Sequence, residues 1–233
     1  MVVPKNAKQK LELHKKEIKE KIDAIKVDTH WFRRVFHTFA ASFLMFYLFP
    51  DELWATVLKI SLAVLFLLIV ILIEYYRIKG RFDNSQFFGL RKYETKRPAG
   101  YLYFGVAMFI LLIFFPPQIA IPCILCACFA DPIIGEVRHR FGKTQAYFIG
   151  FLVCMFFFLI TWFRADITVL IPIALIGASS AVLGETKKFR LIDDDFMIQM
   201  LPAILILIIW LVIKSTGVDI LPDTIIHPLV FNW

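Results

Sequence analysis

Glycine is scarce in this sequence, and its hydrophobic segments do not alternate apolar with polar residues. Only 10 of 233 residues are glycine, whereas 25 are phenylalanine and 59% of the chain is hydrophobic. Soluble domains are about half apolar, so a mean hydropathy of +0.71 argues against a water-soluble domain. Continuous apolar runs also argue against the alternating strands of a transmembrane β-barrel. The predicted fold class is an all-α, polytopic integral membrane helical bundle.

The sequence also contains few cysteines and no internal repeat. The four cysteines all lie inside apolar runs. Cys123, Cys126 and Cys128 have metal-like spacing, but no histidine or hydrophilic turn accompanies them, so we interpret them as small buried side chains. No internal repeat is found, which disfavours a transporter built from two similar halves. Lys- and Glu-rich residues 5–28 precede the first apolar run, which is therefore predicted to be a retained span, not a cleaved signal peptide.

Seven apolar runs are long enough to be membrane-spanning helices, because a hydrocarbon core of about 30 Å needs about 20 residues at about 1.5 Å per residue. Three very short joints predict tight helical hairpins: Asp51-Glu52, Pro116-Pro117 and Arg164-Ala165-Asp166. The predicted spans are 31–49, 54–73, 100–115, 118–134, 146–163, 167–183 and 196–213.

Basic residues are distributed unevenly among the connections. Of 26 Lys and Arg residues, 23 lie in the segment up to Arg34 and in the connections 74–99, 136–144 and 184–195. With seven spans these regions share one side of the membrane, and the positive-inside rule places that side and the N-terminus in the cytoplasm. The predicted location is the plasma membrane of a prokaryote or the endoplasmic reticulum of a eukaryote. Membrane flanks then explain the net charge of +7, and no nucleic-acid partner is predicted.

Three regions follow from this topology. Residues 1–30 carry apolar residues at helical spacing among Lys and Glu, which predicts an amphipathic helix on the cytoplasmic membrane surface or a solvated helical tail. Residues 31–213 form the predicted transmembrane catalytic domain. Residues 214–233 form a predicted extracytoplasmic C-terminal tail. The oligomeric state is open, and a homo-oligomer is compatible with the sequence.

Ionisable side chains gather at the predicted cytoplasmic ends of alternate spans. Such groups are costly near hydrocarbon, so they pair, line a cavity or take part in chemistry. Carboxylates suit Mg²⁺, Arg and Lys suit phosphate oxygens, and a metal-bound nucleoside triphosphate bridges the two kinds. Alternatively, the bases only anchor helices to headgroups and the acids form local ion pairs. The acids are Asp131, Glu185, Asp194 and Asp195, and the bases include Arg33, Arg77, Arg91, Arg97, Arg140 and Lys143.

Asp131 and His37 are the two most informative side chains. Asp131 lies in an apolar stretch where its charge needs a partner, and Pro132 and Gly135 after it predict a broken or kinked helix. A structural kink with Asp131 as its N-cap is the alternative. His37 shares a helical flank with Arg33. It is predicted to be a general base or a hydrogen-bond donor to phosphate, or else a residue that forms a hydrogen bond between helices.

Four short motifs follow one another over about residues 31 to 202. They are Arg33-Arg34-Val-Phe-His37, Glu74-Tyr-Tyr-Arg77, Ala130-Asp131-Pro-Ile-Ile-Gly135 with Arg140-Phe-Gly142-Lys143, and Glu185 with Asp193-Asp194-Asp195. In this order they resemble the group of dolichol kinase, phytol kinase and CTP-dependent diacylglycerol kinase. Two segments depart from the family pattern. The stretch after Lys143 lacks the usual second Lys and the Glu, and the third Asp stands where the family has Asn.

The resemblance implies a Mg²⁺-dependent kinase that transfers the γ-phosphate of CTP to the hydroxyl of a lipid alcohol, such as a polyprenol or another isoprenoid alcohol. The reaction would take place at the cytoplasmic membrane face without a covalent enzyme intermediate. The implied catalytic residues are Asp131, His37 and Glu185, and the implied metal ligands are Asp131, Glu185, Asp194 and Asp195. The implied nucleotide-binding residues are Arg140, Lys143, Arg91, Arg97, Gly135, Gly142, Arg33 and Arg77, and Arg33 and His37 are expected to help position the acceptor.

Two other functions stay open. A phosphatidate cytidylyltransferase also joins CTP to a lipid, but its Lys-Arg, Lys-Asp, His-Gly-Gly and Asp-Arg-x-Asp signature is not found in the sequence, which favours the kinase. A membrane transporter or non-catalytic scaffold with the same fold predicts that the acids pair locally with Arg. The kinase instead predicts that Asp131, Glu185 and Asp194 converge around one cavity that faces the cytoplasm.

Overall fold

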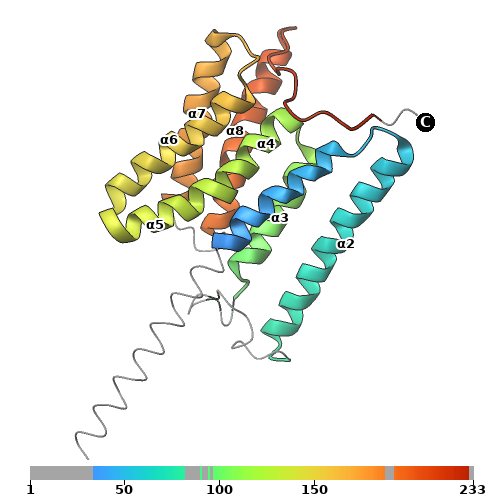
Figure 1. Cartoon of the computed structure of the whole chain (residues 1–233), viewed down its shortest axis with the longest axis vertical. Coiled ribbons are helices and arrows are strands. Elements are labelled where there is room, and N and C mark those ends of the chain that lie inside the picture. Colours follow the sequence, from blue (N-terminus) through green and yellow to red (C-terminus); the bar gives the residue numbers. More distant parts are fainter. Residues whose placement is uncertain (1–33, 82–89, 91–93, 95–96, 187–191, 231–233) are drawn as a thin grey trace, which may run out of the picture.

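The regular structure of this chain is helical. The structure is a computed structural model that describes residues 34–81, 90, 94, 97–186 and 192–230 (Figure 1). Every regular element in these ranges is a helix. The elements are the first helix Arg34–Leu48, which ends in the 3-10 helix η1 (Ala41–Leu48), α2 (Leu53–Ile78), α3 (Gly100–Phe114), α4 (Pro117–Leu125), the π-helix η4 (Cys126–Ala130), α5 (Asp131–Phe141), α6 (Lys143–Thr161), α7 (Ile167–Thr186) and α8 (Asp194–Lys214).

Five helices in the described part of the chain are long and apolar enough to cross a membrane. The predicted all-α membrane fold is confirmed at this level, and the protein is a multi-pass helical membrane protein. Two further apolar helices, Arg34–Leu48 and Gly100–Phe114, are shorter, so each of the seven predicted spans has a helix in its place. The predicted helix over 1–30 lies outside the described residues. The five long helices are Leu53–Ile78, Pro117–Phe141, Lys143–Thr161, Ile167–Thr186 and Asp194–Lys214.

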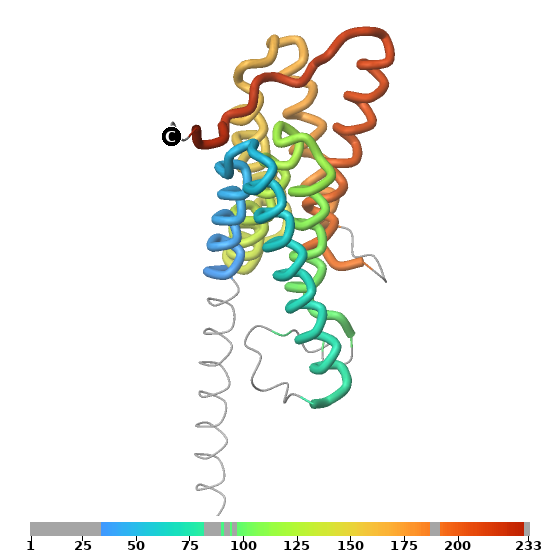
Figure 2. The backbone as a smooth tube through the Cα atoms, turned by 90° about the vertical axis from the view of Figure 1, so that its right-hand side faces the viewer, coloured from blue at the N-terminus to red at the C-terminus, as the bar shows by residue number. Residues whose placement is uncertain are grey.

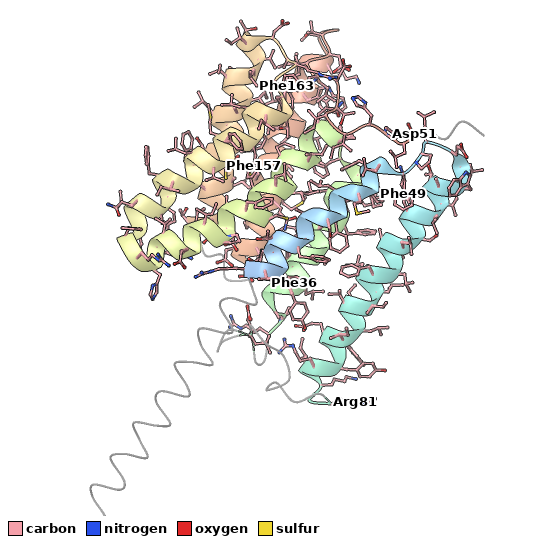
Figure 3. All side chains as sticks on the ribbon, viewed as in Figure 1. Phe36, Phe49, Asp51, Arg81, Phe157 and Phe163 are labelled. Carbon is pink, nitrogen blue, oxygen red and sulfur yellow. The ribbon has the colours of Figure 1, made fainter. Side chains whose placement is uncertain are left out.

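The helices run alternately up and down, so their charged connections meet at one end of the bundle. Phe36 in the first helix and Arg81 after α2 lie toward the lower end in Figure 3, whereas Asp51 and Phe163 lie toward the opposite end. The corner between α5 and α6 and the start of α8 also lie toward the lower end (Figure 1). We call this the charged end. The described residues of the predicted basic connections therefore lie together at the charged end.

Helix α2 stands at the edge of the bundle beside α3 (Figure 1). Its most apolar stretch has a mean hydropathy of 2.9, yet none of the residues in that stretch is buried in the protein. Buried residues of α2 are limited to Ala55 near its start and to Glu74 and Arg77 near its end. The exposed apolar surface is suited to contact with the hydrocarbon of the bilayer.

The predicted break after Asp131 takes a different form in the structure. The chain from Pro117 to Phe141 is one helical segment, and its irregularity is the π-turn η4 directly before Asp131. Ala130 has helical dihedral angles (φ −70°, ψ −39°), so Asp131 is not an N-cap residue. Pro132 lies in the first turn of α5 and has no N–H to donate to the preceding turn, which is compatible with the wider π-turn there.

The predicted basic connection 136–144 is also different, because most of it is helical. Helix α5 continues to Phe141, and its last turn carries Arg138, His139 and Arg140, which interact favourably with the negative end of the helix dipole. Gly142 alone separates α5 from α6, and its φ of 92° is a conformation that glycine adopts without a steric penalty. The corner is therefore a sharp one that presents basic side chains at the charged end.

Small residues allow α7 to pack closely against its neighbours. Its buried residues include Ala174, Gly177, Ala181 and Gly184, which follow helical spacing. The Phe158 ring of α6 fills the space beside Gly177. Close contact through small side chains is a common way to pack helices in a membrane, where apolar surface alone provides no preference for another helix over lipid.

We expect Gly184→Ala to destabilise the protein by about 1–3 kcal/mol, because the packed helices leave no room for a methyl group. A Cβ built on Gly184 lies 2.6 Å from the backbone carbonyl oxygen of Met197 in α8. Thermal unfolding in detergent measures the effect. Gly105→Ala is the matched control, since no heavy atom lies within 4 Å of a Cβ built there. Equal stability of the two variants would contradict close packing of α7 on α8.

The C-terminal segment crosses the end of the bundle opposite the charged end (Figure 2). Leu229 N–H donates to the Leu48 carbonyl at 2.9 Å, and the Gln118 amide donates to the Pro222 carbonyl at 2.9 Å. Asp219 accepts from the Trp210 indole at 2.9 Å, and this hydrogen bond lowers the pKa of Asp219. Within the predicted tail over 214–233, the stretch from Ile220 to Ile226 thus packs on the bundle, and Leu229 is hydrogen-bonded to it.

Candidate functional site

His37 lies where three helices meet near the charged end. Its side chain is 4% exposed, and its ring stacks edge-on against Phe104 of α3 at a centroid distance of 4.7 Å. Nδ1 of His37 is 3.7 Å from Oδ2 of Asp131 in α5, and Nε2 is 3.9 Å from Oδ1 of Asp195 in α8. We call His37, Asp131 and Asp195 the His37 cluster. Each ring nitrogen faces a different carboxylate.

The start of α8 holds Asp195 in place within the His37 cluster. Asp193 is the N-cap residue of α8, and its carboxylate accepts from the Asp194 N–H at 3.0 Å. One turn later, the amide of Gln199 donates to the Asp195 carbonyl at 2.9 Å and to the Phe104 carbonyl at 3.4 Å. Gln199 thereby links α8 to α3 beside the His37 ring.

The donor atoms of the His37 cluster suit a divalent cation. One ligand atom from each of the three side chains lies within 4.8 Å of the others, and the neighbouring Asp193, Asp194 and Asp195 form a second group with the same property. Carboxylate oxygens are the usual ligands of Mg²⁺. Nδ1 of His37 is buried and makes no hydrogen bond with the described residues, so this nitrogen is available for a ligand or a proton.

Glu185 lies close to these acids at the end of α7. It is 2% exposed, and neither of its carboxylate oxygens accepts a hydrogen bond from the described residues. Its Oε1 is 3.2 Å from Nη1 of Arg138, and it interacts electrostatically with Asp131, Asp194 and Asp195. A buried carboxylate among other carboxylates is costly unless cations compensate for it. Arg138 supplies one such cation.

Arg138 lies near these acids, but the site predicted from the sequence did not include it. It follows Asp131 by seven residues, so the two lie two turns apart on one face of α5, about 10 Å along the axis. Gly135 lies between them on that face, and no heavy atom is within 4 Å of a Cβ built there. The spacing would have revealed Arg138 if 136–144 had been predicted as a helix.

The other bases of the α5–α6 corner face outward. Glu136 forms ion pairs with Arg34 of the first helix and with Arg140, whose side chain is 66% exposed. Lys143 is exposed at the first position of α6, directly after Gly142. The predicted phosphate-binding residues Arg140, Gly142 and Lys143 therefore all lie at this corner, whereas Gly135 lies about two turns earlier in α5.

Arg77 has a structural role that the sequence-based assignment to the nucleotide did not anticipate. It is 1% exposed and donates to both oxygens of Glu74, through Nε at 2.7 Å and Nη2 at 2.6 Å. It also donates to the carbonyls of Glu94 at 3.0 Å and Arg97 at 2.7 Å. Glu74 in turn accepts from the Ala99 N–H at 2.7 Å and from the Tyr101 hydroxyl. This network ties the connection after α2 to the start of α3.

The remaining predicted residues divide into described and undescribed ones. Asp194 is 5% exposed in the first turn of α8, and Arg97 is exposed beside the Glu74–Arg77 pair. Arg33 and Arg91 lie outside the described residues. Glu74, Glu136 and Glu185 each have an Arg partner, as the non-catalytic alternative predicts. Asp131 and Asp195 instead converge on His37. This set differs from the predicted one of Asp131, Glu185 and Asp194, and that prediction stays a prediction.

No protein-family model, no curated protein and no solved structure matches this chain. The chemistry of the site therefore rests on its own residues.

Proposed function

We propose that this protein is a membrane-embedded, Mg²⁺-dependent phosphotransferase that moves the γ-phosphate of CTP to the hydroxyl of a lipid alcohol. The observation that carries the proposal is the His37 cluster, in which two carboxylates and an imidazole from three different helices converge; His37 and Asp195 are buried and Asp131 is half-buried. Buried ionisable groups in membrane helices are costly to maintain and usually serve function.

The surroundings of the His37 cluster support phosphoryl transfer in particular. Arg138 lies on the same face of α5 as Asp131, and Arg140 and Lys143 follow at the corner. Phosphoryl transfer depends mainly on positioning and on neutralising the charge of the phosphates, which suits a carboxylate-bound metal with Arg138 nearby and further bases at the adjoining corner. The open position next to Gly135 provides space between the acids and Arg138.

Each residue has a distinct role in this proposal. Asp131 and Asp195 would hold a divalent cation, with Asp194 next to them, and such a cation would supply positive charge for the triphosphate. Arg138 would bind the remaining phosphate charge, and the outward-facing Arg140 and Lys143 would attract the nucleotide to the corner. The acceptor hydroxyl would give its proton to Nδ1 of His37 while its oxygen forms the new bond to the γ-phosphorus. The bond to the β–γ bridging oxygen would break, and CDP would leave with the electron pair.

The proposed topology has seven spans, with the shorter helices Arg34–Leu48 and Gly100–Phe114 crossing together with the five longer ones. The charged end would face the cytoplasm, because basic connections are retained on that side. CTP would then reach the α5–α6 corner from the cytoplasm, while the lipid alcohol would approach within the membrane.

The activity is tested with the purified protein in liposomes, supplied with Mg²⁺, labelled CTP and one of geranylgeraniol, phytol, dolichol or diacylglycerol. We expect label from the γ-phosphorus of CTP to enter the lipid, label from the α-phosphorus to stay in CDP, and EDTA to abolish transfer. Replacing CTP by ATP or GTP measures nucleotide preference.

Two outcomes would contradict the kinase. Transfer of the α-phosphorus into phosphatidate, supplied in a parallel sample, would indicate a cytidylyltransferase. Failure to label any of the four alcohols with folded protein would favour the transporter or scaffold, in which the acids only stabilise the helices. Folding is checked in each sample by its thermal unfolding curve.

A further inference from the structure

An apolar groove lies between the first helix, α2 and α3. It has a volume of about 60 Å³, and side chains from all three helices line it. The ring centroids of Phe43 in the first helix and Phe66 in α2 are 5.0 Å apart, so aromatic rings connect the two helices along the groove. The lining also includes the small residues Ala40, Ala63 and Gly105, which leave space between the rings.

One end of this groove adjoins the His37 cluster. Phe36 and Phe104 both line the groove, and both rings also pack edge-on against His37, at centroid distances of 6.5 Å and 4.7 Å. The groove and the His37 cluster therefore share the rings of Phe36 and Phe104 as a common wall. An apolar chain here would place a terminal polar group toward His37.

The groove also borders the lipid-facing side of α2. Phe36 is 39% exposed and Phe66 is 40% exposed, so both rings reach the surface that faces hydrocarbon. A lipid can enter from the bilayer without its chain crossing the charged end. The volume accommodates only a few carbon atoms, since a single water-sized site takes about 10–15 Å³. The groove would thus hold the part of one chain next to its polar end and leave the remainder in the bilayer.

We infer that this groove binds one hydrocarbon chain of a lipid alcohol, with the hydroxyl directed toward His37. The inference rests on the proposed function and specifies its acceptor: a lipid alcohol that places one hydrocarbon chain in the groove, since the volume of about 60 Å³ is too small for two chains side by side. The aromatic rings of Phe36, Phe66 and Phe104 provide apolar contact for the chain. Because the groove contacts only the first carbons, acceptors of different length that share the same first unit would bind alike.

Binding is tested without catalysis by a diazirine analogue of geranylgeraniol that carries the photoreactive group near its hydroxyl. In liposomes of full-length protein we expect labelling of the helix segments that line the groove, within 36–43, 63–70 and 101–112. Excess geranylgeraniol should displace the probe, whereas the same excess of phosphatidylglycerol should not. Displacement of the probe by both lipids would overturn the inference, and so would uniform labelling of all lipid-facing helices.

Gly105→Leu fills the groove from α3, since no heavy atom lies within 4 Å of a Cβ at this position, and Ala63→Leu fills it from α2. We expect each variant to lower probe labelling and kcat/KM for geranylgeraniol roughly tenfold or more, without changing KM for CTP. Val64→Leu is the control, because Val64 adjoins Ala63 on α2 but does not line the groove. Equal behaviour of Ala63→Leu and Val64→Leu would contradict the inference.

The two proposals fail separately. If the wild-type protein phosphorylates none of the alcohols but the probe labels the groove and geranylgeraniol displaces it, the kinase is wrong and the binding site stands. If the protein is an active kinase while both groove variants retain full activity and labelling lies elsewhere, the groove is wrong and the kinase stands.

Discussion

Asp195→Asn is expected to lower the rate of phosphoryl transfer about a thousandfold, a loss comparable to the removal of one well-placed charge-stabilising group in other enzymes. The substitution keeps the size of the side chain and removes its charge. Asp195 is 1% exposed and lies 3.9 Å from His37, so a carboxamide there would weaken metal binding and change the electrostatics of the imidazole. The measurement is kcat with saturating CTP at several Mg²⁺ concentrations, since a lost ligand also raises the metal requirement.

Asp219→Asn is the matched control for this substitution. Asp219 belongs to the C-terminal segment that follows α8 and crosses the opposite end of the bundle (Figure 2), and its exposed carboxylate pairs with Lys214 at 3.4 Å. Its substitution should leave kcat within about twofold of the wild type, because exposed ion pairs contribute little. Full activity of Asp195→Asn would show that the His37 cluster is not the catalytic centre, and the scaffold or transporter would then be favoured. Thermal unfolding of both variants separates a catalytic loss from a folding defect.

Glu74→Gln is expected to destabilise the protein by about 3–5 kcal/mol, because it leaves the buried Arg77 guanidinium without its carboxylate. Glu74 is 2% exposed and accepts from Arg77, from the Ala99 N–H and from the Tyr101 hydroxyl. The double variant Glu74→Gln/Arg77→Met removes both charges, and we expect it to recover part of the loss. Unfolding by heat or denaturant in detergent measures all of these variants.

Glu136→Gln is the comparison for the buried pair. Glu136 also pairs with arginines, but Arg34 and Arg140 are 40% and 66% exposed, so the expected loss is below about 1 kcal/mol. A similar loss for Glu74→Gln and Glu136→Gln would mean that the Glu74–Arg77 pair does not hold α2 to the start of α3. Reduced kinase activity of Glu74→Gln at a temperature where it is folded would indicate that the connection carrying Arg97 also serves the site.

Much of the helical organisation could be predicted because it depends on local sequence. The hairpin joints at Asp51, Pro116 and Arg164 lie between helices, as expected from runs of apolar residues with short polar or proline interruptions. The prediction of a loop at 136–144 was wrong, and the reason is also local. Its charged residues resemble a loop by hydropathy, yet Arg138, His139 and Arg140 are compatible with the last turn of a helix that ends at Gly142.

The orientation of Asp131 could not be predicted from periodicity. The π-turn at Cys126–Ala130 adds a residue to one turn, and an added residue rotates the helix that follows by about 100°. Helical spacing from the apolar residues before the turn therefore gives the wrong face for Asp131. Likewise, the motif containing Glu74 and Arg77 indicates two charged residues one turn apart, but only packing against Ala99 and Tyr101 makes that pair a buried structural one.

The sequence by itself determined that this is a helical membrane protein, where most of its helices lie along the chain, and that its acids and bases gather at alternate connections. These properties depend on the length of apolar runs and on the order of charges, which are local or additive. Only the tertiary structure decided that His37, Asp131 and Asp195 meet while Arg77 is enclosed. Contacts between residues far apart in the chain depend on how each helix is rotated and how closely it packs, and therefore on small residues such as Gly184 and on the π-turn together.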